Sequence, residues 1–150
     1  MEPNAVFKSS FGGSPITSFP DYVKRVKKYA LLKDEDFCAI ACILKQVCDK
    51  YEYINQAMNY KLFACAVLAY IKMYFDNLQT NTYYGHIFGI HITTLNKLEL
   101  EFLEMLDWNV NVSIEQYDIN SEWLKNNNSD CPQLIEHVFS FKKLHILKET

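Results

Sequence analysis

The stretch from Tyr60 to Asp76, YKLFACAVLAYIKMYFD, constrains the fold of this chain more than any other. Almost every position is apolar, and the stretch contains neither proline nor glycine. A surface helix carries one apolar and one charged face, whereas a helix that is apolar all round is enclosed by its neighbours. Alanine, leucine and methionine outnumber the β-branched residues, which favours a helix over a strand. We therefore predict a buried central helix.

Two lysines interrupt this stretch, Lys61 and Lys72. Because of these charges, and because a membrane span needs about eighteen or more uninterrupted apolar residues, the stretch is not a membrane span. Lys72 stands deep in the apolar pattern. A buried lysine must be paired, extend to the surface or lose its proton. Lys72 is therefore the first candidate for a functional side chain.

The composition is that of one folded domain, and it argues against some classes of function. The chain has 150 residues, of which 49% are hydrophobic and 15% aromatic, and this is enough for a real core. The formal net charge of −3 argues against nucleic-acid binding through phosphate contacts. No apolar segment of signal-peptide length begins the chain, so we expect an intracellular protein, in the nucleus or cytoplasm and not at a membrane.

Helical periodicity runs along the chain after residues 1–18, which we interpret as a flexible N-terminal arm. The residues from Phe19 to Ala30 form an amphipathic helix whose outer face is basic. A second helix is predicted from Asp34, which we take as its cap, to about Lys50. The central helix follows a short polar link.

Shorter helices are predicted beyond the central one. The segment TYYGHIFG forms a brief helix that stops at Gly89 in a left-handed conformation. Thr93 or Thr94 caps the next helix, Ser113 caps another through a capping box, and Pro132 begins the last. This makes about seven helices with no strand, no internal repeat and no second domain. The predicted fold class is an all-α globular domain.

The residues that catalysis requires are missing from the chain. It has no GxSxG, HExxH, GxGxxG or P-loop motif. Its four histidines and five cysteines lack the spacing of a metal site; Cys38 and Cys42 share a helix face, but two ligands do not make a site. We interpret the cysteines as small buried residues. The prediction is a binding or regulatory module without enzymatic activity, metal or cofactor.

Motifs in a fixed order then point to a family. The chain reads DYVKRVKKY over residues 21–29, KMYFDNLQTNTYYGHIFGI over 72–90 and LNKLELEFLEMLDWNVNVS over 95–113. These motifs and their spacing resemble those of the P-type (phosphate-regulon type, or P/U-type) cyclins of fungi and protists. The resemblance extends from Phe19 to about Tyr117.

The resemblance implies a single five-helix cyclin box around the buried central helix, with flanking N- and C-terminal helices. The box with its flanking helix 1 would cover residues 19–117, and a C-terminal helical extension residues 118–150. The implied function is that of a non-catalytic subunit that activates a cyclin-dependent protein kinase. It would act as a 1:1 heterodimer, in cell-cycle control or in nutrient and phosphate signalling.

In cyclins, a lysine of the third box helix and a glutamate of the fifth bridge to the αC-helix region of the kinase. The resemblance puts these roles on Lys72 and Glu99. The alternative is an internal salt bridge between two helices, which contributes little if it is exposed. The apolar residues implied to accompany the pair at the kinase interface are Met73, Leu103, Trp108 and Val110.

The chain departs from the family in two places. A pair of acids that follows the third box helix in the family is here Phe75 and Asp76, so one acid is missing. The MRAIL-type substrate-docking motif of A-type cyclins is also absent. Two alternatives to a kinase activator stay open: a cyclin-fold transcription adaptor, which would favour tandem boxes and a basic surface, and a scaffold that has lost kinase binding.

Overall fold

The computed structural model describes residues 17–54 and 56–149, and the side chains of this part through residue 140 except that of residue 56. Within these residues the chain forms seven α-helices and no β-strand, so the all-α prediction is confirmed. Most of the predicted N-terminal arm, residues 1–16, lies outside the described part. The elements in chain order are α2 (Phe19–Tyr29), α3 (Asp34–Lys50), the 3₁₀ turn η1 (Gln56–Met58), α4 (Asn59–Tyr74), α5 (Asn81–Phe88), α6 (Ile92–Met105), α7 (Ile114–Asn126) and α8 (Cys131–Glu149).

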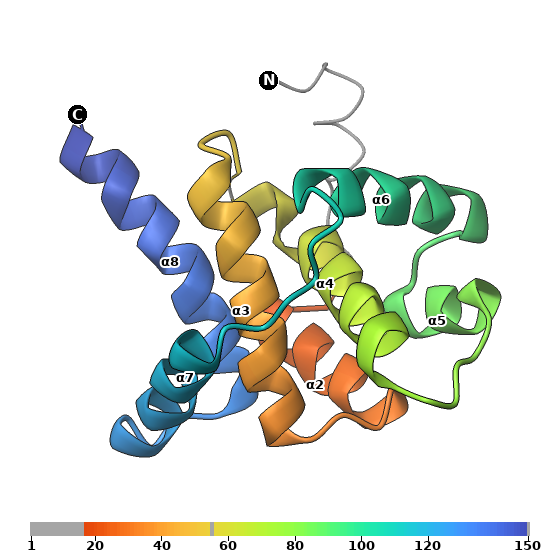
Figure 1. The fold of residues 1–150 in the computed structure, drawn as a ribbon, viewed down its shortest axis with the longest axis horizontal. Helices are drawn as coiled ribbons and strands as arrows, with labels where there is room; N and C mark the ends of the chain where they lie inside the picture. Colours follow the sequence, from red (N-terminus) through yellow and green to blue (C-terminus); the bar gives the residue numbers. More distant parts are fainter. Residues whose placement is uncertain (1–16, 55, 150) are drawn as a thin grey trace.

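Helix α4 is buried on all sides through its middle, as its apolar sequence predicts. Every residue from Leu62 to Ala69 is buried, and so is Ile71. Helix α4 packs against α2, α3 and α6. The centre is nevertheless shared, because α3 is also buried on nearly every side from Phe37 to Leu44. Helix α3 contacts α4 on one side and α7 and α8 on the other (Figure 1).

Local capping residues set several of the helix boundaries. The Ser18 hydroxyl accepts a hydrogen bond from the Asp21 N–H at 3.3 Å, and the Ser113 hydroxyl accepts one from the Gln116 N–H at 3.3 Å. Gly89 ends α5 at φ 66°, a left-handed conformation that glycine adopts without steric cost. The start of α2 at Phe19, the Ser113 cap and the stop at Gly89 agree with the sequence prediction.

Two predicted caps were wrong. Helix α6 begins at Ile92, and the cap is His91, whose Nδ1 accepts a hydrogen bond from the Thr93 N–H at 3.2 Å. Helix α3 begins with Asp34 itself rather than after it, and its first turn is tied by the Lys33 N–H, which donates to Asp36 Oδ2 at 2.7 Å. In both places the side chain that accepts the hydrogen bond at the start of the helix is not the one expected. It belongs to His91 in α6 and to Asp36 in α3.

An aromatic cluster joins the first helices to the centre. Phe63 on α4 is fully buried, and its ring lies 6.0 Å from Phe19 and 6.3 Å from Tyr22 on α2 and 6.1 Å from Phe37 on α3, between ring centroids. The Tyr22 hydroxyl donates a hydrogen bond to the Phe88 carbonyl at 2.6 Å, which ties α2 to α5. Tyr29, the last residue of α2, lies outside this cluster and is 54% exposed.

One carboxyl of α6 works against stability. The Oε2 atom of Glu101 is buried, and it has no hydrogen-bond partner among the described residues. Burial raises the pKa of Glu101, against a smaller lowering by Lys97. The folded chain therefore holds this proton to a higher pH than the unfolded chain does. Stability is lost as the pH rises from the ordinary pKa of glutamate through the raised pKa of Glu101.

We accordingly expect Glu101→Gln to raise the melting temperature at neutral pH, because the neutral amide carries no charge to desolvate. The gain should shrink as the pH falls toward about 4, where glutamate is normally protonated. Thermal unfolding followed by circular dichroism at several pH values measures this. Glu104→Gln, a change at an exposed position of the same helix, is the control. A gain that does not depend on pH would contradict the account.

None of the helices in the described residues is long and apolar enough to cross a membrane.

Candidate functional site

Lys72 and Glu99, which are far apart in the chain, meet between the end of α4 and the middle of α6. Lys72 Nζ lies 2.6 Å from Glu99 Oε2. The lysine side chain is 36% exposed and the glutamate side chain 17% exposed. Two features make this charge tolerable in an apolar helix. Lys72 lies in the last turn of α4, where its side chain reaches the surface, and its ammonium group is paired with a carboxylate.

A third residue holds the glutamate in place. Asn81, the first residue of α5, donates from Nδ2 to Glu99 Oε1 at 3.0 Å and to Asn96 Oδ1 at 2.8 Å. Both carboxylate oxygens of Glu99 are thus bound, one by a charge and one by an amide. Sequence reasoning missed Asn81, because nothing in the local pattern of α5 connects it with α6. The spacing of Asn96 and Glu99 on α6 was the available signal, since residues three apart share a helix face.

This arrangement fixes what the pair can do chemically. An ammonium group has three donor hydrogens, and the ion pair with Glu99 uses one direction. Because the lysine is partly exposed, its other donors can bind main-chain carbonyls of a docked protein. A carboxylate held by two partners loses little conformational freedom when such a protein binds.

The chain after α6 turns sharply through two residues in the left-handed region, Asp107 at φ 52° and Trp108 at φ 61°. This conformation costs about 1–2 kcal/mol for each residue that has a Cβ atom. The turn is closed by the Trp108 N–H, which donates to the Leu103 carbonyl at 2.9 Å. Lys50 on α3 forms an ion pair with Asp107. As a result, the Trp108 side chain is 60% exposed on the surface.

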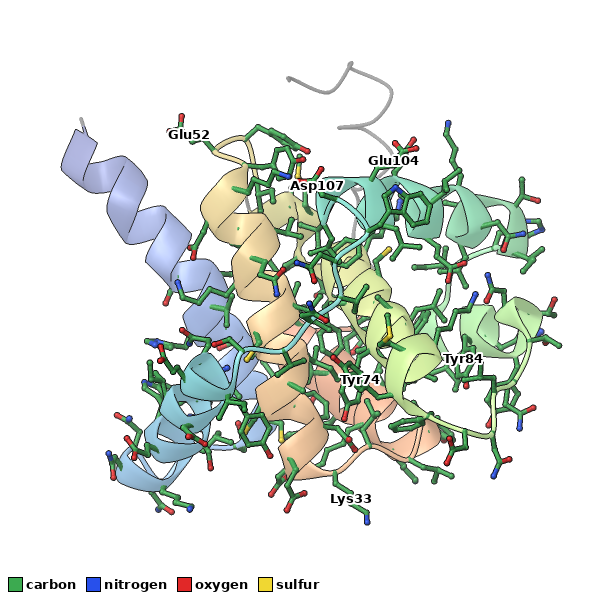
Figure 2. The ribbon with its side chains drawn as sticks, viewed as in Figure 1. Lys33, Glu52, Tyr74, Tyr84, Glu104 and Asp107 are labelled. Carbon is green, nitrogen blue, oxygen red and sulfur yellow. The ribbon has the colours of Figure 1, made fainter. Side chains whose placement is uncertain are left out.

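The other sequence-predicted residues differ in exposure. Met73 is 53% exposed and Leu103 is half-buried against the core. Val110 is only 4% exposed, and its carbonyl accepts a hydrogen bond from the Tyr74 hydroxyl at 2.9 Å. Figure 2 shows Tyr74 between α3 and α4, and Figure 1 shows the link from α6 to α7 crossing both helices. Val110 thus lies in the core and anchors the end of α4 rather than facing solvent.

Two exposed apolar side chains that the sequence analysis did not select lie beside the ion pair in the chain. Tyr74 is 47% exposed and Leu100 is 51% exposed. Leu100 follows Glu99 directly and falls outside the buried stripe of α6. An apolar residue off the buried stripe of an amphipathic helix was the signal that could have identified it. We define the Lys72–Glu99 surface as Lys72, Met73, Tyr74, Glu99, Leu100, Leu103 and Trp108.

Where the family has the first of two acids, this chain has Phe75, which packs against another aromatic ring. Phe75 is the C-cap of α4, and its ring lies 5.7 Å from that of Tyr70. The Tyr70 hydroxyl donates to Asp36 Oδ1 at 2.6 Å, and burial together with this hydrogen bond raises the pKa of Tyr70. Asp76 is exposed. The end of α4 is therefore held by aromatic contacts.

Among the side chains that the structure describes, the histidines and cysteines form no metal site. All five cysteines are buried, and none is in a disulfide. Cys42 and Cys38 lie one helical turn apart, and the Cys42 thiol donates to the Cys38 carbonyl at 3.2 Å. In the described part of the chain, no group of three His, Cys, Asp or Glu side chains could hold a metal ion.

The chain was compared with models of known protein families. The family model for cyclins matches residues 3–110 of this chain. The chain belongs to the cyclin family. Cyclins are non-catalytic regulators of protein kinases, which agrees with the lack of a catalytic constellation in the sequence. The cyclin match covers α2 to α6 and the turn that carries Trp108.

Individual relatives specify the type of cyclin. The chain is 30% identical to the Nuc-1 negative regulatory protein preg of Neurospora crassa, over 65% of this chain and 20% of that protein. It is 26% identical to PHO85 cyclin-like protein psl1 of Schizosaccharomyces pombe, over 75% of this chain and 49% of that protein. It is 24% identical to Cyclin-U3-1 of Arabidopsis thaliana, over 88% of this chain and 60% of that protein. These relatives confirm the resemblance to P/U-type cyclins, although the cyclin spans only 20% to 60% of their lengths.

Proposed function

We propose that this cyclin is the activating subunit of a cyclin-dependent protein kinase and binds it as a 1:1 heterodimer inside the cell. In this proposal α2 to α6 are the five helices of the cyclin box. The predicted boundary between residues 117 and 118 falls inside α7, so most of α7 and all of α8 belong to the C-terminal extension. The observation that carries the proposal is the ion pair of Lys72 with Glu99, which Asn81 holds in place and which has exposed apolar residues next to it in the sequence.

The Lys72–Glu99 surface has the composition of a protein interface. It combines a braced charge pair with exposed apolar anchors, among them Trp108 and Met73. Tryptophan is the residue type most enriched in interface hot spots, and charged groups beside such anchors fix the orientation of the partner. The pair would bond to main-chain groups near the αC-helix of the kinase, while the anchors pack around it. Val110 would support this surface from the core.

Activation follows from a shift between two kinase conformations. A kinase is active when its β3-strand lysine pairs with the αC-helix glutamate. A cyclin that binds the active αC position more tightly shifts the equilibrium by the difference in affinity. A change from 1:99 to 99:1 needs about 5.5 kcal/mol. An interface of about 1,600 Å² with well-packed anchors can supply this difference.

The direct test is reconstitution. The names of two relatives, PHO85 cyclin-like protein psl1 and PHO85 cyclin-7, make a kinase of the PHO85 type the first partner to test. The purified chain should bind this kinase at a 1:1 ratio in size-exclusion chromatography with light scattering. It should also raise phosphate transfer to a peptide substrate in proportion to the complex formed. Binding without any activation would favour the scaffold alternative.

Trp108→Gly should separate binding from folding. Removing the indole should weaken kinase binding by about 2 kcal/mol or more, roughly 30-fold, as for an interface hot spot. Glycine adopts the left-handed conformation of this position at no steric cost, so the melting temperature should not fall. The measurement is kinase activity against titrated cyclin, together with thermal unfolding.

The matched control is Lys24→Ala, which changes an exposed residue on the outer face of α2. Its effect on activation should be small, because an exposed charge at a rim contributes little to affinity. An equal or larger loss for Lys24→Ala would move the kinase interface to the basic face of α2.

A further inference from the structure

A cavity of about 250 Å³ lies between α3, α7 and α8. Figure 1 shows α7 and α8 on the other side of α3 from α4, α5 and α6. None of the residues that line the cavity belongs to the Lys72–Glu99 surface, so the two sites are separate. The cyclin match ends at residue 110, so the α7 and α8 walls come from the extension that follows.

The walls of the cavity are mainly apolar and partly exposed. Ile119 on α7 is 56% exposed. The rings of Trp123 on α7 and His137 on α8 stack with centroids 4.4 Å apart, and Val138 continues the wall. An isoleucine that is more than half exposed beside a stacked indole keeps apolar surface in contact with water, and a ligand that covered it would gain the hydrophobic free energy.

The most deeply buried polar group in the cavity wall, the Asn120 amide, is already hydrogen-bonded within the protein. Asn120 is 5% exposed; its Nδ2 donates to the Cys38 carbonyl at 3.0 Å, and its Oδ1 accepts from Gln116 Nε2 at 3.0 Å. These amides brace α7 against α3, so a ligand would gain little from hydrogen bonds to them. Because the walls are mainly apolar and the Asn120 amide is taken up, we expect the group that enters the cavity to be apolar.

The size of the cavity restricts that group further. Sites for drug-sized molecules have volumes of about 300–1,000 Å³. This cavity is smaller, so it fits a single anchoring side chain better than a whole cofactor. A flat aromatic side chain would extend the stack of Trp123 and His137, and either an aromatic side chain or a leucine would cover Ile119.

Charges beside the cavity indicate what should flank the anchor. Glu115 and Glu122 are exposed on α7, one turn before and one turn after Ile119. Neither is in an ion pair within the described side chains. Lys45 on the α3 wall is neutralised by Asp49 at 2.7 Å. The α7 rim is therefore acidic and complements basic residues.

We propose that this cavity is a docking site for a short peptide segment of another protein, with one aromatic or leucine anchor flanked by lysine or arginine. The segment would lie along α7 with its anchor over Ile119 and its basic residues beside Glu115 and Glu122. Through this contact the cyclin would hold a second protein while the kinase occupies the opposite side.

The test is a selection from a phage library of random dodecapeptides on the full chain, with counter-selection on Ile119→Lys. Recovered peptides should share an aromatic or leucine residue with basic neighbours. In a Trp108→Phe background Trp123 is the remaining tryptophan, so its fluorescence should change when a synthetic peptide of the recovered sequence is added. Replacing the anchor of the peptide with serine should abolish this change.

Variants then locate the site. Ile119→Lys should weaken peptide binding at least tenfold, and Glu115→Lys with Glu122→Lys should weaken it and reduce its salt dependence. Ile114→Lys is the matched control: Ile114 is on the same helix and 79% exposed, and it is not among the residues that line the cavity. The affinity of the Ile114→Lys variant for the peptide should equal that of the unchanged chain.

Several results would overturn the proposal. One is the recovery of no peptide that depends on Ile119, and another is an equal loss with Ile114→Lys. A preference for acidic flanking residues would contradict the charge argument. If the chain without peptide self-associates, and Ile119→Lys abolishes this association, the occupant is a second copy of the cyclin rather than a peptide.

Discussion

Glu99→Ala is expected to weaken kinase binding by about 2–5 kcal/mol, which is roughly 30-fold or more. In the free chain Glu99 Oε2 lies 2.6 Å from Lys72 Nζ, and Oε1 accepts a hydrogen bond from Asn81. If a kinase covers this site, water is excluded from Lys72. Truncating Glu99 would then leave the Lys72 ammonium buried in the interface without its counter-charge. The cost of removing this unpaired charge from water accounts for most of the lost binding free energy.

The measurement is the dissociation constant by calorimetry for Lys72→Ala, Glu99→Ala and the double variant. Because the two side chains contact each other, their effects should not add, and the double variant should lose less than the sum of the single losses. Glu122→Ala, an exposed acid on α7, is the control and should leave affinity unchanged. Each variant should remain folded by circular dichroism. Normal binding by both single variants would show that the pair only links α4 to α6.

Phe63→Ala is expected to lower the free energy of unfolding by about 3–5 kcal/mol. Phe63 is fully buried on α4, and its ring meets those of Phe19, Tyr22 and Phe37. Removing it would open a cavity where α2, α3 and α4 join, and the surrounding rings can collapse into it only in part. Since domains of this size have total stabilities of about 5–15 kcal/mol, the variant should be only marginally folded at 37 °C.

Urea unfolding followed by circular dichroism measures this loss. Phe63→Leu should cost less than Phe63→Ala, because leucine retains most of the volume. Tyr29→Ala removes an aromatic ring that is 54% exposed, and it should change stability by no more than about 0.5 kcal/mol. If Phe63→Ala and Tyr29→Ala had similar effects, α4 would not be the core of the fold.

The helices and several of their boundaries followed from the sequence because local interactions determine them. The apolar run around Leu68 predicts burial on all sides, since no rotation of such a helix could place a polar face outward. The Ser18 and Ser113 caps and the Gly89 stop depend on hydrogen bonds and dihedral angles within a few residues. Where two local candidates competed, as with His91 and Thr93, the pattern alone did not decide.

The candidate site followed from the sequence only in part. The motifs selected Lys72 and Glu99, and the two side chains do meet. The same motifs included Trp108 and Val110, which are only two residues apart but differ completely in exposure, 60% against 4%. The left-handed turn at Asp107 and Trp108 produces this difference. Aspartate adopts this conformation more often than most residues with a Cβ atom, but tryptophan does not, so the sequence did not predict two such residues in a row.

By itself, the sequence determined that this protein is all-α, where most of its helices run, and which charge in the buried helix needs a partner. Only the tertiary structure decided that Asn81 holds Glu99, that α3 shares the centre with α4, and that α7 and α8 enclose a cavity. The physical reason is the distance along the sequence over which each kind of interaction acts. Helix periodicity and capping act over a few residues, whereas Asn81 and Glu99, or Asn120 and Cys38, meet only because whole helices pack at particular angles.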